Sequence, residues 1–419
     1  MKKIDLKYGK NIISFNIDDK NYCDTINPNK IEIDLVDEEE IRRALENPIS
    51  SKRLKDIVEK NEKIVIITSD ITRPLPSYKI LPLVIAELRA GGIREEDITI
   101  VLALGSHRKH TEAEKENLVG SAVYNSKVAV IDSDMNKCVN LGICKNGTLV
   151  DIFEPVVHAD KRICLGNIEY HYFAGYSGGS KAIMPGVSSW RAIQANHANM
   201  TKAGAYAGNL ESNPVRQDID QISEFISIDF IVNVVLDDKK RVIKAVAGHW
   251  KDSHREGCRV LDSMYLKEIA EKADIVVLSP GGYPKDINIY QAQKGLDNAQ
   301  HAVRDGGIIV WCASASEGFG EGNFEIWMKT KTPKEMIEEI KENFILGGHK
   351  AAAIAMVLEK CQVYMVSDLA ESLVRSINLV PFNSVQEAVD KAILSLGENS
   401  SVIIMPYAGS TLPRYKGKS

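Results

Sequence analysis

The stretch HYFAGYSGGSKAIMPG, residues 171–186, concentrates side chains that could do chemistry. Its four glycines would let the backbone approach a ligand closely, and Ser177 and Ser180 with the adjoining amides could surround a phosphate. The GxxxxGK(S/T) loop and the GxGxxG turn are both missing, so the sequence does not predict a standard ATP or NAD site. Lys181 could neutralise an anion or, if it is uncharged, attack an acyl or carbonyl carbon. The sequence leaves both roles open.

Histidines form a second group of candidates. His107 follows a glycine turn, and His171 and His197 lie on either side of Lys181 in the sequence. Imidazole titrates near neutral pH and is a ligand for nickel, zinc and copper, so acid/base work or metal binding is possible, although HxxxH and HExxH are absent. Each histidine could instead be a packing residue. We expect His110 to be structural, because the Thr-x-x-Glu that follows it predicts a capping box at a helix start.

Two further pairs could bind anions. Arg73 offers a fork of donors suited to a carboxylate or phosphate, and Asp70 could orient it, although Asp-x-x-Arg is also common in salt-bridged turns. Gln291 and Lys294 are three residues apart, so they share one face of a predicted helix. Such a face is often simply solvated.

These residues follow strand-like apolar runs, where ligands bind in open α/β sheets. The first series predicts strands at 63–70, 97–104, 127–134, 162–169 and 230–237, with a helix from Tyr78 to Ala90. A second series predicts strands at 273–282, 306–318, 361–368 and 401–409, with a surface helix over 325–344.

The alternation of strands and helices predicts an α/β fold of two domains, each with a mostly parallel sheet flanked by helices. A length of 419 residues also exceeds what one core usually holds. A polar stretch from Lys251 to Lys272 is predicted to be helical and to link the two series, and we place the boundary near Tyr265. The expected division is 1–265 for a cofactor-binding and catalytic domain, 266–400 for a closing α/β domain and 401–419 for a terminal strand and tail. The active site should lie in the cleft between the domains.

Composition excludes several classes of protein. There is no apolar run of about 18 residues, so no membrane span is predicted, and a net charge of −5 without a basic cluster argues against nucleic-acid binding. The N-terminus lacks the apolar core of a secretory signal, and the seven cysteines never form CxxC. A cytoplasmic protein with small-molecule partners is expected.

In combination, the motifs resemble those of the nickel-pincer lactate racemases. DxxR from Asp70, GSHR from Gly105, the SGGxKxxxPG core, Asn196-His197 and QxxK from Gln291 occur in this order through the whole chain. Five motifs at compatible spacings are far more specific than any one of them. The resemblance implies a racemase or epimerase of 2-hydroxy acids, which moves a hydride to the cofactor and back through a 2-keto acid.

The resemblance also implies the cofactor, nickel(II) held by a pyridinium-3,5-bisthiocarboxylic acid mononucleotide. By position, Lys181 matches the lysine that carries this group covalently, and His197 matches the nickel ligand. Proteins that synthesise the cofactor and insert nickel would then be partners. The cofactor-binding residues implied in this way are Asp70, Thr72, Arg73, Ser177, Gly178, Gly179, Lys181, Pro185 and His197.

Catalytic and substrate-binding residues follow from the same comparison. His107 and His171 match a pair of acid/base histidines, which suits racemisation because a proton must leave the hydroxyl of either enantiomer. Arg73, Gln291 and Lys294 match residues that hold the cofactor or the substrate carboxylate, and substrate binding is expected for them; His349 is a further substrate-binding candidate, for the reason given next.

One departure affects the substrate. Lactate-acting members place a tryptophan near the position of Gly347–Lys350, and none of the four tryptophans of this chain lies there in the sequence. A larger, more polar 2-hydroxy acid is therefore expected, with His349 or Lys350 at its far end. Alternatives are a C2 epimerase of sugar acids and a racemase of malate-like diacids. A non-catalytic carrier of cofactor or nickel is disfavoured, because it would not need both His107 and His171.

Overall fold

The computed structural model describes residues 1–237, 239–415 and 417, and it divides into two compact units. One unit is formed by residues 31–263, and the other by residues 1–30 together with 264–419. The expected division into 1–265, 266–400 and 401–419 therefore needs correction. The first 30 residues join the C-terminal unit, because Leu6, Phe15 and Ile17 lie in its hydrophobic core. Residues 402–405 are a strand inside the sheet of that unit and not an appended tail.

The unit formed by residues 31–263 follows an α/β order from its first helix. Its elements are α1 (Asp37–Glu46), η1 (Leu54–Asp56), β4 (Ile64–Ser69), α2 (Ser77–Ala90), η2 (Glu95–Asp97), β5 (Ile98–Ala103), α3 (Glu112–Val119), α4 (Ser121–Tyr124), β6 (Ala129–Asp132), β7 (Cys138–Ile143), β8 (Leu149–Phe153), α5 (Glu154–Val157), β9 (Lys161–Asn167), β10 (Tyr170–His171), β11 (Gly175–Tyr176), η3 (Gly179–Ala182), α6 (Trp190–Ala198), η4 (Asn199–Thr201), α7 (Pro214–Gln221), η5 (Ile222–Glu224), β12 (Phe230–Leu236), β13 (Val242–Gly248) and α8 (Trp250–Tyr265).

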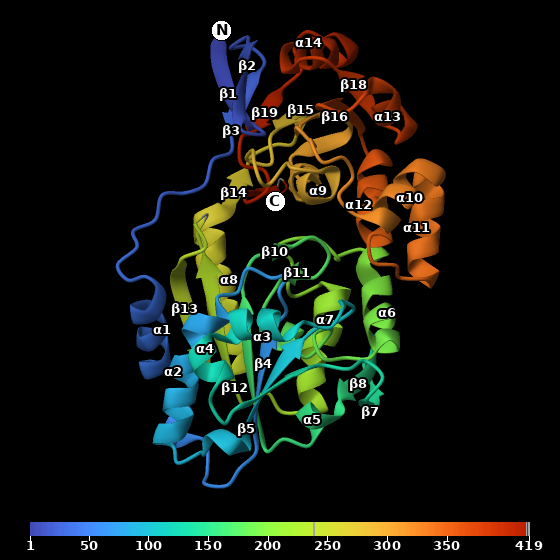
Figure 1. Ribbon diagram of the computed structural model, residues 1–419. Coiled ribbons are helices and arrows are strands. Elements are labelled where there is room, and N and C mark those ends of the chain that lie inside the picture. The colour runs from blue at the N-terminus through green and yellow to red at the C-terminus, as the bar shows by residue number, and fades with distance from the viewer. Residues whose placement is uncertain (238, 416, 418–419) are drawn as a thin grey trace. The chain divides into compact units, whose positions relative to one another are not determined.

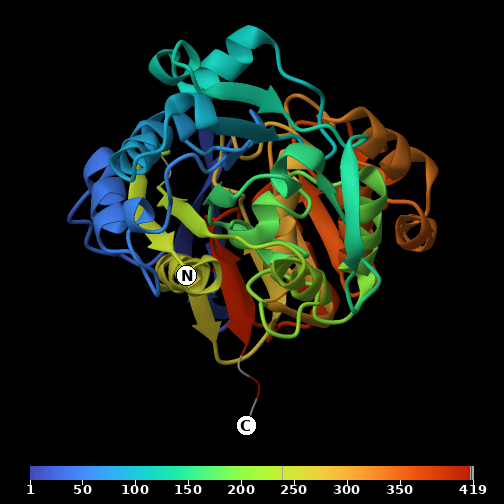
Figure 2. The same cartoon turned by 90° about the horizontal axis from the view of Figure 1, so that it is seen from below.

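Six of these strands form one sheet in the order β13-β12-β9-β4-β5-β6, in which only the β12–β13 pair is antiparallel. The first five residues of β4 are buried, which fits a central parallel strand covered on both faces. Helices α1 and α2, blue in Figures 1 and 2, lie together, and their apolar side chains share a core with β4, β5, β9 and β12. Gly257 of α8 packs closely against Ile168 and Val246, so α8 lies against the sheet.

The other unit is built around a second sheet. Its elements are β1 (Lys2–Tyr8), β2 (Asn11–Ile17), β3 (Tyr22–Thr25), β14 (Leu266–Ile269), β15 (Ala273–Leu278), α9 (Ile289–Ala299), β16 (Val303–Cys312), α10 (Gly322–Thr330), α11 (Pro333–Glu342), α12 (Gly348–Leu358), β17 (Gln362–Val366), α13 (Glu371–Ser376), β18 (Val380–Phe382), α14 (Val385–Leu396), β19 (Val402–Met405) and β20 (Leu412–Tyr415).

The second sheet has the order β18-β17-β16-β15-β19-β3, and every neighbouring pair is parallel. The β1–β2 hairpin lies beside α14 over this sheet (Figure 1), and both elements contribute to one core with β15, β16 and β17. The predicted class, two α/β domains with parallel-rich sheets, is thus confirmed.

Two local predictions were wrong in detail. The single helix expected over 325–344 is two helices, because Thr332 caps a new helix that has Pro333 in its first turn. The helix expected from Lys251 to Lys272 ends at Tyr265, and the chain continues as strand β14. Across the part of the chain that the structure describes, no helix combines the length and the apolar character needed to cross a membrane.

Candidate active site

The carboxyl ends of three neighbouring strands bring the predicted residues of the first unit together. β4 lies between β9 and β5 and is parallel to both. The chain order reverses at β4, since β5 and β6 follow on one side and β9 and β12 on the other, and such switch points are where open α/β sheets bind ligands. The backbone N–H of Gly105, after β5, donates to the carbonyl of Gly186 at 2.9 Å, which joins two of the three segments.

His107 is held by a buried carboxylate. Its Nδ1 lies 2.6 Å from Oδ2 of Asp70, and the hydroxyl of Thr72 donates to the other carboxylate oxygen at 2.8 Å. Asp70 is 3% exposed, whereas a quarter of the His107 side chain is open to solvent. Burial alone would raise the pKa of Asp70, but its hydrogen bond and attraction to His107, the Thr72 hydroxyl and the charge of Arg73 bring it below its ordinary value.

The Asp70 carboxylate therefore orients His107, and not Arg73 as the DxxR pattern suggested. A carboxylate at Nδ1 fixes the proton on that nitrogen and leaves Nε2 as the atom that can exchange a proton with a ligand. The second nitrogen of His107 makes no hydrogen bond to any residue that the structure describes. The Arg73 side chain is exposed and likewise has no ion pair within the described residues, so it is available to an anion.

His110 is structural, as predicted. Its ring donates from Nδ1 to Asp132 at 2.6 Å, and its Nε2 accepts the backbone N–H of Ile71 at 3.2 Å. Both nitrogens are therefore occupied. Thr111 caps α3 and completes the predicted capping box with Glu114.

Three glycines of the 171–186 stretch are required by the packing of the loop. Gly175, Gly178 and Gly179 have positive φ angles, which L side chains rarely adopt. An added Cβ would lie 2.0 Å from the carbonyl oxygen of Asn209 at Gly175, 2.8 Å from Oδ1 of Asn233 at Gly178 and 2.9 Å from the ring of His254 at Gly179. The lack of a side chain at these three positions therefore lets the loop pack tightly against Asn209, Asn233 and His254. Contact of the loop backbone with a ligand stays a prediction.

Polar groups of the same loop are also used internally. The Ser177 hydroxyl donates to the carbonyl of Asn167 at 2.7 Å and accepts the N–H of Glu169 at 2.9 Å. The N–H of Gly179 donates to Oδ1 of Asn233 at 2.7 Å. The phosphate-surrounding role predicted for the serine hydroxyls is therefore not supported at Ser177, whose hydroxyl fixes the loop.

Lys181 lies in η3, half-buried, and its Nζ makes no hydrogen bond or ion pair within the described residues. Burial, together with the positive charges of Arg73 and Arg216, lowers its pKa well below the ordinary value, and Glu169 opposes this only weakly. The amine is consequently biased toward the uncharged form, which is the nucleophilic one. Of the two roles that the sequence left open, the environment favours the nucleophile.

His171 has one ring nitrogen occupied and one available. Its Nδ1 accepts the N–H of Ala174 at 3.2 Å, and no described residue bonds to Nε2. Burial, and then the charges of Lys181, Arg73 and other neighbouring cations, lowers the pKa of His171 well below its usual range. The ring is therefore uncharged at neutral pH and can accept a proton.

His197 lies near the end of α6 and is buried. The Phe173 ring packs edge-on against both His171, at 4.5 Å between centroids, and His197, at 5.0 Å. The Met184–Pro185 bond, in the same loop, is cis. Among the described residues, no three His, Cys, Asp or Glu side chains are grouped so that they could hold a metal ion by themselves.

The other predicted residues belong to the second unit. Gln291 and Lys294 lie on α9, with Gln291 exposed and Lys294 half-buried. His349, in the first turn of α12, is 8% exposed, and its Nδ1 accepts the N–H of Gly347 at 3.1 Å. Lys350 donates to the carbonyl of Tyr290 at 2.7 Å. Both His349 and Lys350 therefore have partners inside their own unit.

A tryptophan does lie beside Gly348. A Cβ added at Gly348 would be 2.7 Å from the ring of Trp327, which is buried in α10. The sequence has no tryptophan at positions 347–350, but Trp327 lies close to Gly348 in space because α10 packs on α12.

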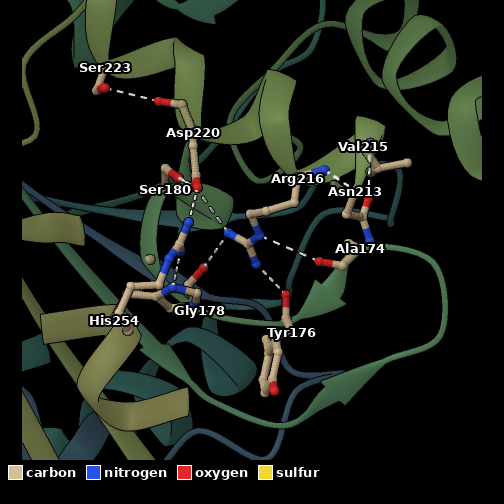
Figure 3. A network of polar contacts seen from close by, with 12 residues as sticks. Ala174, Tyr176, Gly178, Ser180, Asn213, Val215, Arg216, Asp220, Ser223 and His254 are labelled. Carbon is tan, nitrogen blue, oxygen red and sulfur yellow. Dashed lines mark hydrogen bonds and ion pairs between the residues drawn. The ribbon is translucent and has the colours of Figure 1, made fainter. Parts of the chain in front are cut away.

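Sequence reasoning missed a buried polar network beneath the loop, built on Arg216, Asp220 and His254. Arg216 is fully buried in α7, and Figure 3 shows its guanidinium turned toward the loop backbone. Arg216 and Asp220 lie far from His254 and from the loop in the sequence, so these contacts could not be predicted from it. Only the start of helix α7 has a local sequence signal, the N-cap Asn213 followed by Pro214.

Comparison with known proteins covers nearly the whole chain. Residues 8–208 match the lactate racemase N-terminal domain, and residues 269–412 match the lactate racemase C-terminal domain. A lactate racemase from Thermoanaerobacterium thermosaccharolyticum is 34% identical over 99% of this chain and 100% of its own length. A lactate racemase from Lactiplantibacillus plantarum is 33% identical over 97% of this chain and 98% of its own length.

Solved structures agree with this assignment. The structure of the lactate racemase apoprotein from Thermoanaerobacterium thermosaccharolyticum superposes with a TM-score of 0.88 at 32% identity, covering 99% of this chain and 100% of that one. A protein from Thermotoga maritima shares the fold, with a TM-score of 0.63 at 17% identity over 90% of this chain and 98% of that one. With both domains matched and its relatives aligned from end to end, this chain belongs to the lactate racemase family, a family of isomerases.

Proposed function

We propose that this chain interconverts the enantiomers of a 2-hydroxy acid, with lactate among its substrates. The observation that carries the proposal is a pair of histidines at one sheet edge, each with one ring nitrogen fixed by the protein and the other unused by described residues. Lys181 stands in the same neighbourhood, since the charge of its protonated form helps to lower the pKa of His171.

The residues fit the nickel-pincer nucleotide that the family resemblance implies. Lys181 has the low pKa and the unused amine that a covalent attachment requires, and the imidazole of His197 is a suitable donor for nickel(II). When bound, this group supplies a carbon that takes up the C2 hydride of the substrate and returns it. We assign the attachment to Lys181 and the protein ligand of nickel to His197.

His107 and His171 carry the proton in this proposal. Asp70 keeps the proton of His107 on Nδ1, so Nε2 is the basic atom, and burial keeps His171 in its uncharged form. One of them removes the hydroxyl proton of the bound enantiomer. The other gives a proton to the carbonyl oxygen of the 2-keto acid when the opposite enantiomer forms. Arg73 binds an anionic group, because its exposed guanidinium offers a bidentate fork.

The expected preference for a larger acid depended on the lack of a tryptophan at positions 347–350. Trp327 packs on Gly348, which supports lactate as a substrate instead. His349, which was expected to reach a larger substrate, is buried with its Nδ1 occupied. The two full-length relatives are named for lactate, so lactate is the first substrate to test.

The test uses the full chain produced with and without the proteins that synthesise the cofactor, which we propose as its partners in the cytoplasm. We expect a covalent mass increase, bound nickel and racemisation only in the first preparation. Turnover is followed on both enantiomers of lactate, malate, 2-hydroxyglutarate and gluconate by chiral chromatography.

Lys181→Ala should lack the mass increase, whereas His197→Ala should keep it and retain less nickel. A matched control is Lys350→Ala, which removes a lysine bound to a backbone carbonyl in the other unit and should keep the adduct. Full racemase activity in unmodified, nickel-free protein would show that the proposed chemistry is wrong.

A further inference from the structure

Arg216 clamps the loop that connects His171 to Lys181. Its side chain is fully buried, and the guanidinium donates to three alternate carbonyls of that loop. Nε donates to Ala174 at 3.4 Å, Nη1 to Gly178 at 3.5 Å, and Nη2 to Tyr176 (Figure 3). One side chain on α7 thus holds the backbone at both ends and the middle of a five-residue segment.

Helix α8 holds the same segment through a second set of contacts. The carbonyl of Ser177, between those that Arg216 binds, accepts the Nε2 proton of His254 at 2.8 Å. Arg255 donates to Nδ1 of His254 at 2.8 Å and to Asp220, and Asp220 accepts the Ser180 hydroxyl at 2.9 Å. Asp220 also accepts Arg216 at 3.5 Å, so the contacts form one network (Figure 3).

We propose that Arg216 is a positioning residue of the active site, which sets the place of Lys181 and His171 by fixing the backbone between them. This proposal rests on the function proposed above. The loop contains only two residues of strand β11 and the short η3 turn, so regular secondary structure does little to hold it. Catalytic groups must be kept within about 0.5 Å of their productive positions, which requires such support.

The charge of the network also suits the site. Arg216 and Arg255 outnumber Asp220, and His254 is uncharged because burial, followed by the two arginines, lowers its pKa to about 3. One positive charge is therefore in excess beneath the loop. Of the charged groups that face Lys181, Arg216 and Arg73 favour the neutral amine and Glu169 opposes it.

Packing alone does not account for this side chain. Burying a guanidinium is costly, and an apolar residue of similar volume can replace a buried ion pair with little loss of stability. Arg216 instead uses its planar fork to bind backbone carbonyls, a geometry that lysine does not reproduce. Replacement by lysine therefore keeps the positive charge but loses the hydrogen bonds to the three loop carbonyls.

The experiment compares Arg216→Lys and Arg216→Met with the parent chain. Hydrogen exchange of the peptide containing residues 174–181 should be faster in both variants, and kcat should fall with little change in KM. Acylation of Lys181 in cofactor-free protein, followed by peptide mass against pH, should need a higher pH in Arg216→Met but not in Arg216→Lys. A rise of about one pKa unit would cut the reactive fraction about tenfold at neutral pH.

Arg162→Met is the matched control. Arg162 is also buried in this unit and donates to the carbonyls of Ala159 at 2.6 Å and Ser227 at 2.7 Å, away from the loop. It should lose stability without a change in Lys181 acylation or in exchange of 174–181. If Arg216→Met does not fold, Arg216→Lys decides the question through hydrogen exchange and kcat.

Unchanged exchange and unchanged kcat in a folded Arg216→Lys variant would overturn the proposal. Faster exchange of residues 174–181 and a lower Lys181 reactivity in Arg162→Met, equal to those in Arg216→Met, would also overturn it. A parent chain that racemises no 2-hydroxy acid would refute the proposed function instead. Exchange and acylation would still report in that case on the placement of Lys181.

Discussion

Replacing Asp70 by asparagine tests whether the Asp70–His107 pair works in catalysis. The change keeps the shape but removes the charge that accepts the Nδ1 proton at 2.6 Å, and it turns one of the two carboxylate oxygens that contact His107 and Thr72 into an NH2 group, which can only donate. A charge-assisted hydrogen bond contributes about 1.5–3 kcal/mol. Because a quarter of the His107 side chain is exposed, we expect the lower part of this range, about 1.5–2 kcal/mol. Such a loss corresponds to a fall in kcat of about 10- to 30-fold.

The assay is racemisation of lactate in both directions by the cofactor-loaded enzyme, with thermal unfolding as a check on the fold. In a His107→Ala background the Asp70→Asn change should add little, because the two residues act as one unit. Asp132→Asn is the matched control, since Asp132 holds His110 at the same 2.6 Å but both nitrogens of His110 are occupied. Equal losses of kcat in the two variants, or no loss in Asp70→Asn, would refute the reasoning.

Three more predictions follow from the same structure. His107→Ala and His171→Ala should each lower kcat by about 100-fold or more, the usual scale for a positioned acid or base, and a parental rate in either variant would make that histidine structural. Gly175→Ala should destabilise the protein by more than Gly147→Ala in urea unfolding. Both glycines have positive φ, which costs an L residue about 1–2 kcal/mol, but the new Cβ lies 2.0 Å from a carbonyl oxygen at Gly175 and meets nothing within 4 Å at Gly147. The pKa of His301 is lowered by burial to about 4, so below about pH 6.5 the unfolded chain takes up a proton that the folded chain does not. The free energy of unfolding should therefore fall between pH 6.5 and 4, by at most about 1.4 kcal/mol per pH unit from this group, and a His301→Gln variant with the parental slope would contradict that origin.

Strands were the most predictable part of the fold. Apolar runs such as 63–70 and 97–104 correspond to β4 and β5, because a parallel strand buried on both faces needs a continuous run of branched apolar residues. The N-terminal hairpin was not assigned to the C-terminal unit. Its alternating pattern shows that one face is buried but does not show against which core, since that depends on contacts across hundreds of residues.

Candidate residues were found more readily than their partners. His107 and Lys181 stood out because their residue types and glycine-rich surroundings are unusual. His107 follows β5 and Lys181 lies in the segment after β9, and these two strands lie on either side of β4. The partner of His107 was missed, since Asp70 is 37 positions away and a nearer arginine offered a simpler pairing. Arg216 was not predicted either. It donates to backbone carbonyls about 40 positions away in the sequence, and no sequence pattern indicates such contacts.

The most direct test of the central claim follows deuterium at C2 of the substrate. The enzyme, produced with the cofactor-synthesis proteins, is given one enantiomer of 2-deuterolactate in ordinary water, and the opposite enantiomer is isolated and its mass measured. A hydride that leaves C2 and returns to it predicts that the product keeps the deuterium. Racemisation with loss of the deuterium to solvent would show that a proton is abstracted from C2 instead, and it would contradict the account given for His107, His171 and Lys181.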